Sequence, residues 1–143
     1  MNCIVVDDEP LAREAVEILI RLYGDGLNWL GSFNSAESAS AFMVNTPVDL
    51  VFLDVRMPHI NGLEFARSLS RNTLVIFTTA YAEYALDSYE VEAIDYLVKP
   101  INLLRFGKAV TKAIHYQSLL KQEEKEDIED IDAEFILVKS ERL

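Results

Sequence analysis

The sequence is poor in the residues that mark secreted, fibrous and disordered proteins. Its 143 residues contain one cysteine, four prolines and five glycines. The single cysteine, Cys3, excludes an intrachain disulfide and any metal site built from several thiolates. Half of the residues are hydrophobic, which excludes a disordered or collagen-like chain. A folded core is therefore expected, in one domain of ordinary size.

Positive charge is scarce as well. Lys and Arg number 13 against 24 Asp and Glu, which gives a formal net charge of −11. Nucleic-acid contacts need basic side chains that face phosphates, so we do not expect this chain by itself to bind DNA.

Long hydrophobic runs are also missing. No apolar stretch approaches the length needed to cross a bilayer, and the acids at residues 7–9 come too early for a signal peptide. We therefore expect no membrane contact and a cytoplasmic location.

What the sequence does contain is an alternation of short apolar runs with longer segments of helical period. This alternation is typical of βα units around a parallel sheet that is buried on both faces. We expect strands at Cys3–Val6, Trp29–Phe33, Val48–Leu53, Thr73–Thr78 and Ala93–Val98. We expect helices from Pro10 to Gly24, after an N-cap at Ser35, from near Gly62, at about Ala82–Tyr89, and from after Pro100 to about Gln122.

The C-terminal end differs in composition from the rest. Residues 123–134 hold eight acids and one base, so we expect a globular domain at residues 1–122 followed by an acidic linker at 123–134. Phe135–Val138 predicts a new strand, the start of a further domain at residues 135–143 that is too short to fold alone.

Polar side chains follow four of the predicted strands. Asp7 and Asp8 come after the first, Asp54 after the third, Thr79 after the fourth and Lys99 after the fifth. A doubly wound parallel sheet gathers such residues in one crevice at the carboxyl ends of its strands. Several carboxylates in one crevice repel one another unless a cation lies among them, and ligands that are all oxygen favour Mg²⁺.

The same set suits phosphoryl transfer to a carboxylate. Asp54 is the candidate nucleophile, the Lys99 ammonium and the Thr79 hydroxyl can bind phosphoryl oxygens, and main-chain N–H groups at Met57 and Ala80 can bind the rest.

These residues resemble a known family, the bacterial two-component response-regulator receiver domain. The motifs are Val5-Val6-Asp7-Asp8-Glu9, Asp54 followed by Met57-Pro58 and Gly62, Thr79-Ala80, and Asp95-Tyr96-Leu97-Val98-Lys99-Pro100. The resemblance covers about residues 2–122. It implies an α/β flavodoxin-like sheet of five parallel strands in the order 2-1-3-4-5, with five flanking helices.

The resemblance also implies roles for the metal site. Asp54 would be the phosphoacceptor of a sensor histidine kinase and, like Asp8, a direct Mg²⁺ ligand. Asp7 would act through water, and Arg56 would offer its main-chain carbonyl. The chain would then be a phosphoacceptor switch and not a conventional enzyme.

Further implied features concern signalling. Thr79 would move toward the phosphoryl group, Tyr96 would rotate inward, and the Lys99–Pro100 peptide bond would be cis. A homodimer would form through the fourth-helix, fifth-strand and fifth-helix face.

The region after Ala93 is most similar to receivers that precede a LytTR-type DNA-binding domain. Residues 135–140 resemble the first strand of such a domain. DNA would then be bound only through a C-terminal domain that this sequence does not contain.

Other interpretations stay open at this point. Taken singly, Asp7 and Asp8 suit a helix N-terminus, Asp54 suits a turn, and Thr78 competes with Thr79 for the hydroxyl role. A pseudo-receiver, which binds partners and is never phosphorylated, has the same fold. A phosphohydrolase with an aspartyl-phosphate intermediate is disfavoured because residue 56, where that family needs a second acid, is arginine.

Overall fold

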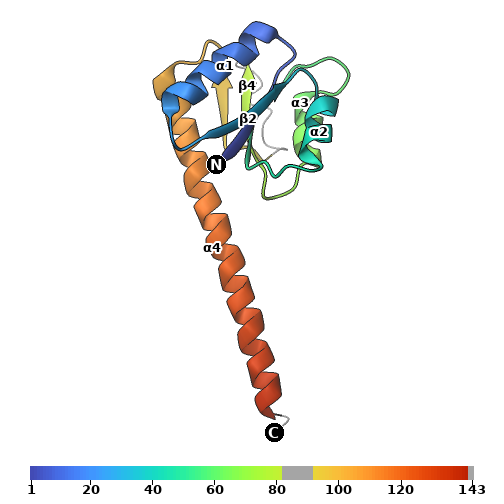
Figure 1. Cartoon of the computed structure of the whole chain (residues 1–143), viewed down its shortest axis with the longest axis vertical. Helices are drawn as coiled ribbons and strands as arrows, with labels where there is room; N and C mark the ends of the chain where they lie inside the picture. The colour runs from blue at the N-terminus through green and yellow to red at the C-terminus, as the bar shows by residue number, and fades with distance from the viewer. Residues whose placement is uncertain (82–91, 142–143) are drawn as a thin grey trace.

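A five-stranded parallel sheet with helices on both faces forms the body of the protein, and one long helix extends away from it (Figure 1). The computed structural model describes the backbone of residues 1–81 and 92–141 and the side chains of residues 1–81 and 92–129.

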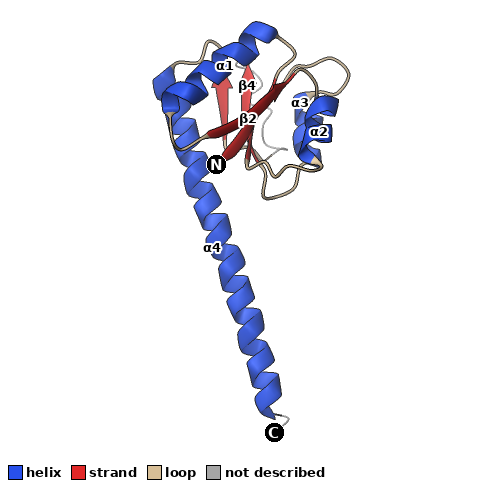
Figure 2. Cartoon of the chain, viewed as in Figure 1, coloured by secondary structure: helices blue, strands red, loops and turns tan. Residues whose placement is uncertain are grey.

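The elements follow the predicted alternation (Figure 2). In chain order they are β1 (Asn2–Val6), α1 (Pro10–Tyr23), β2 (Asn28–Phe33), α2 (Ala36–Met43), β3 (Leu50–Asp54), α3 (Gly62–Ser68), β4 (Leu74–Thr79), β5 (Asp95–Val98) and α4 (Leu103–Glu141). All five predicted strands are confirmed, with boundaries that differ by one or two residues. Four of the five predicted helices lie in the described residues, and the one at about Ala82–Tyr89 lies outside them.

The strand order is β2-β1-β3-β4-β5, and every neighbouring pair is parallel. This confirms the predicted order. The chain adds β2 on one side of β1 and then β3 on the other, so the order reverses between β1 and β3. A crevice at the carboxyl ends of these two strands is the usual ligand site of such sheets.

The core lies on both faces of the sheet because successive strand residues point to opposite sides. In β1, Cys3 and Val5 belong to the core under α1 and α4, and Ile4 and Val6 to the core under α2 and α3. Phe52 of β3 stacks on Phe106 of α4, with ring centroids 5.2 Å apart. The three central strands β1, β3 and β4 are therefore apolar except at their ends, where their polar residues lie.

Local sequence accounts for the helix starts. Pro10 occupies the first turn of α1, where its missing N–H costs nothing, and Gly24 ends that helix at a φ of 93°. The Ser35 hydroxyl accepts a hydrogen bond from the Ser38 N–H at 3.2 Å, which confirms it as the N-cap of α2.

Helix α4 corrects two predictions. It does not end near Gln122, as expected for the last helix, but continues to Glu141. The strand predicted at Phe135–Val138 is wrong, because the backbone is helical as far as Glu141. No proline or glycine follows Gly107. The segment 121–126 consists of Lys, Gln and Glu, which are good helix formers. Side chains 121–129 are all exposed, so this part of α4 projects beyond the domain core. The division at residues 122 and 134 stays a prediction.

Within the described part of the chain, no helix combines the length and apolar character that a membrane span requires.

Candidate metal centre

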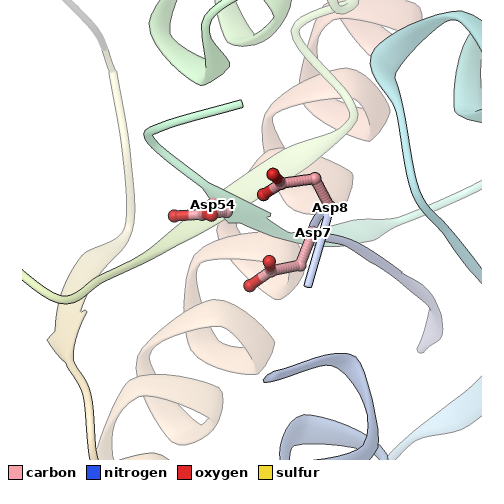
Figure 3. A group of neighbouring side chains, drawn as sticks. All are labelled: Asp7, Asp8 and Asp54. Atoms are coloured by element: carbon pink, nitrogen blue, oxygen red, sulfur yellow. The ribbon is translucent and has the colours of Figure 1, made fainter. Parts of the chain in front are cut away.

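Three carboxylates converge at the point where the strand order reverses. Asp7 and Asp8 directly follow β1, and Asp54 is the last residue of β3, the strand paired with β1. Each can offer an oxygen such that all three oxygens lie within 4.8 Å of one another. Figure 3 shows the three side chains approaching one another. The predicted convergence of these residues is therefore confirmed.

Asp7 is the most constrained of the three, since its side chain is only 1 % exposed. Its Oδ1 accepts a hydrogen bond from the Glu9 N–H at 3.0 Å, and its Oδ2 forms an ion pair with Lys99 Nζ at 2.8 Å. Its N–H donates to the Phe33 carbonyl at 3.0 Å, and its own carbonyl accepts from Arg13 at 2.7 Å. Both carboxylate oxygens already have partners, which suits the prediction that Asp7 meets a metal through water.

Asp54 is also buried, but its negative charge is offset by fewer and longer contacts than that of Asp7. Its Oδ2 lies 3.7 Å from Lys99 Nζ, and its Oδ1 accepts a 3.4 Å hydrogen bond from the Arg56 N–H. Burial, and then the negative charge of Asp7, raise the pKa of Asp54 from 3.8 to about 7, although Lys99 acts in the opposite direction. The ionised carboxylate is therefore held in an unfavourable environment that a nearby cation would relieve.

Lys99 is shared between these two acids. Its burial lowers the pKa of the ammonium, but the hydrogen bond to Asp7 and the charge of Asp54 outweigh burial, so the pKa rises. Lys99 is charged at neutral pH and has a donor near both carboxylates. The fifth strand thus brings a positive charge to the acid cluster, as predicted.

The donor set fits a hard divalent cation. All candidate side-chain ligands are oxygens, two of the carboxylates are buried, and Asp8 is partly exposed. Mg²⁺ prefers two or three such oxygens with water in its remaining positions. Because Asp8 is partly exposed, water can reach this side of the ligand set.

Gly62 is a part of the site whose role the sequence did not reveal. A Cβ at this position would lie 2.1 Å from the Asp54 carbonyl oxygen, and the Gly62 N–H donates to the Val55 carbonyl at 2.9 Å. The first turn of α3 therefore lies directly against the backbone of the predicted acceptor. The requirement for glycine at this position is therefore space beside Asp54.

Thr79 lies at the carboxyl end of β4 and is fully buried. Its hydroxyl accepts from the Tyr81 N–H at 3.0 Å and can donate to the Tyr81 carbonyl at 3.4 Å. Its own carbonyl accepts from the Lys99 N–H at 2.7 Å. The hydroxyl is thus engaged by the loop after its own strand, and its movement toward a phosphoryl group stays a prediction.

The aromatic ring of Tyr96 packs against the core. It stacks on Phe77 of β4, with ring centroids 5.0 Å apart, and its main-chain carbonyl accepts from Arg105 at 3.3 Å. Its rotation as a switch stays a prediction. The cis peptide bond at Lys99–Pro100 is confirmed.

The loop after β3 and the loop after β4 touch through a side-chain contact. The Arg56 guanidinium lies 4.6 Å from the centroid of the Tyr81 ring. The roles of the Arg56 carbonyl and of the N–H groups of Met57 and Ala80 stay predictions.

Known proteins match this chain over most of its length. The family model described as "Response regulator receiver domain" matches residues 3–111. The positive alginate biosynthesis regulatory protein of Pseudomonas aeruginosa is 42% identical over 119 residues, which covers 79% of this chain and 47% of the relative. Transcriptional regulatory protein BtsR of Salmonella typhimurium is 36% identical over 130 residues, covering 90% of this chain and 52% of the relative.

A solved structure has the same fold. The response regulatory domain of protein mrkE from Klebsiella pneumoniae is 29% identical, superimposes with a TM-score of 0.74, and covers 83% of this chain and 99% of that structure. By contrast, this chain spans about half the length of the curated relatives described above.

Proposed function

The chain belongs to the response regulator receiver family, and on that premise we propose that Asp54 accepts a phosphoryl group from the phosphohistidine of a sensor kinase. Response regulators act in two-component systems, in which histidine kinases phosphorylate them. The observation that carries the proposal is the convergence of three carboxylates within 4.8 Å, with Lys99 Nζ 2.8 Å from Asp7 and 3.7 Å from Asp54.

In the proposed reaction an oxygen of the Asp54 carboxylate attacks phosphorus. A phosphorus–oxygen bond forms, the phosphorus–nitrogen bond to the kinase histidine breaks, and the imidazole nitrogen keeps the electron pair and takes up a proton. Lys99 holds an oxygen of the transferred group by charge, and the Thr79 hydroxyl and the Met57 and Ala80 N–H groups bind the others.

Asp8 and Asp54 would hold Mg²⁺ directly, Asp7 through water, and Arg56 through its carbonyl. When bound, Mg²⁺ supplies positive charge that favours ionised Asp54 and offsets the charge of the phosphoryl oxygens. The pKa of Asp54 of about 7 supports this assignment, because burial and Asp7 disfavour its ionised form when no cation is present.

Phosphorylation by a small donor tests the proposal. The protein is incubated with acetyl phosphate and Mg²⁺, and with acetyl phosphate and a chelator. We expect a mass gain of one phosphoryl group only with Mg²⁺, and borohydride trapping should map it to Asp54. No gain would favour the pseudo-receiver, and steady release of phosphate from many small phosphate esters would favour the phosphohydrolase.

Lys99→Ala should separate metal binding from phosphoryl transfer. Because Lys99 is expected to meet phosphoryl oxygens and not the metal, the variant should bind Mg²⁺ at least as well as the parent, since a positive charge beside two carboxylates is removed. It should gain phosphate about 100-fold more slowly. Stopped-flow measurement with acetyl phosphate gives the rate, and Lys108→Ala, which removes the same charge from α4, is the control. An unchanged rate would remove Lys99 from the reaction.

The rest of the signalling assignment follows from the same premise. The added charge would draw Thr79 inward and let Tyr96 repack, which alters the fifth-strand face where a homodimer would form.

Residues 1–122 would be the receiver and 123–134 a linker, with 135–143 opening a LytTR-type DNA-binding domain in a cytoplasmic transcription regulator. The names of the relatives as regulatory proteins support this output.

A further inference from the structure

Arg13 makes a contact that the proposed chemistry does not use. Its Nη1 donates a partly buried 2.7 Å hydrogen bond to the main-chain carbonyl of Asp7, six residues earlier. That carbonyl belongs to the peptide that joins Asp7 to Asp8. One guanidinium therefore holds the main chain between two of the three clustered carboxylates.

The position of Arg13 in its helix indicates that the contact matters. Arg13 is the fourth residue of α1, and its N–H closes the first turn on the Glu9 carbonyl at 3.1 Å. A cation near a helix N-terminus opposes the helix dipole, which costs about 0.3 to 1 kcal/mol. The first turn of α1 holds no acid, and the short contact with the Asp7 carbonyl is one interaction that offsets this cost.

Asp8 has most need of such support. Asp7 is fixed by hydrogen bonds at both carboxylate oxygens, at its N–H and at its carbonyl. Asp8 is partly exposed, so packing does not hold its side chain, and its direction depends on the main chain. The peptide plane that Arg13 holds, together with the φ torsion of Asp8, sets the direction of the Asp8 Cα–Cβ bond.

We propose that Arg13 is a positioning residue for the divalent cation: by holding the Asp7–Asp8 peptide it aims the Asp8 carboxylate at Asp54. This inference rests on the proposed function for the identity of the cation. Groups that orient metal ligands in this way change affinity without touching the metal. The planar guanidinium suits a fixed, directed bond to a carbonyl better than an ammonium does.

Two opposite effects of removing Arg13 can be told apart. Loss of orientation should weaken Mg²⁺ binding, whereas loss of a nearby positive charge should strengthen it. We expect the loss of orientation to have the larger effect on Mg²⁺ affinity, because the hydrogen bond is short and directed. The effect of the Arg13 charge is reduced by solvent screening, since the site is partly exposed.

Calorimetric Mg²⁺ titration of the parent, Arg13→Ala, Arg13→Lys and Arg21→Ala tests this. Arg21 is exposed in the last turn of the same helix and controls for charge. We expect about tenfold weaker binding for Arg13→Ala, a smaller loss for Arg13→Lys and none for Arg21→Ala. Unchanged or tighter binding by Arg13→Ala would overturn the proposal, and Arg13→Lys serves alone if the alanine variant does not fold.

A second measurement separates positioning from general stability. Raising Mg²⁺ to saturation should restore the phosphorylation rate of Arg13→Ala, and a rate that stays low would indicate another role. If the parent protein binds Mg²⁺ but takes up no phosphoryl group, the proposed function is wrong. The role of Arg13 is still tested in that case, because it depends only on the Mg²⁺ affinities of the Arg13 variants.

Discussion

Asp54→Asn is expected to abolish phosphoryl uptake and, in the absence of metal, to make the protein more stable at pH 8. Asparagine has no carboxylate oxygen to attack phosphorus. It also removes a charge that burial and Asp7 disfavour, the two main causes that raise the pKa of Asp54 from 3.8 to about 7. A nucleophile and an unfavourable buried charge disappear together.

The pH dependence of this stabilisation follows from linkage. The folded state holds the Asp54 proton more tightly than the unfolded state, so the parent loses stability as the pH rises from about 4 to about 7. Above about 7 the full penalty is present, with a ceiling of about 4 kcal/mol. Asp54→Asn should therefore gain most at pH 8 and little at pH 4.

Urea unfolding in a chelating buffer at both pH values measures the effect. Asp25→Asn is the control because Asp25 is an exposed loop residue. Added Mg²⁺ should narrow the gap at pH 8 by stabilising the parent, which binds it better. Equal stability of variant and parent at pH 8 would show that Asp54 carries no such penalty, and phosphoryl uptake by Asp54→Asn would move the acceptor elsewhere.

Gly62→Ala is expected to destabilise the protein by about 4 kcal/mol or more. The added Cβ would lie 2.1 Å from the Asp54 carbonyl oxygen and 3.0 Å from Val55 Cα, and both are backbone atoms that no rotamer change can move away. Either α3 shifts outward or β3 shifts at its end. A shift at β3 also displaces the acceptor, so Mg²⁺ affinity should fall in any variant that still folds.

Gly107→Ala provides the matched control. A Cβ at Gly107 in α4 meets nothing within 4 Å, and alanine is about 1 kcal/mol better than glycine inside a helix. This variant should be slightly more stable than the parent in the same urea titration. If Gly62→Ala were equally well tolerated, the close approach of α3 to Asp54 would not exist in solution.

Much of the site was predictable because strand position determines it. Asp54 ends one apolar run and Asp7 and Asp8 follow another, so any parallel arrangement with these strands adjacent brings the three together. The predicted strand at Phe135–Val138 failed because β-branched and aromatic residues also occur in helices. Nothing in this segment breaks the helix that precedes it, and within the described residues no strand pairs with it.

The sequence by itself determined the alternation of strands and helices, the excess of acid and the set of polar residues at the strand ends, since each follows from local pattern. Only the tertiary structure decided that Lys99 bonds Asp7 more closely than Asp54, that Arg13 holds the Asp7–Asp8 peptide, and that Gly62 is needed for space. The first contact joins segments far apart in the chain, and the other two join a helix to the end of the strand before it. Their distances depend on how whole elements pack. The pKa of Asp54 belongs with them, because burial and a neighbouring charge exist only after folding.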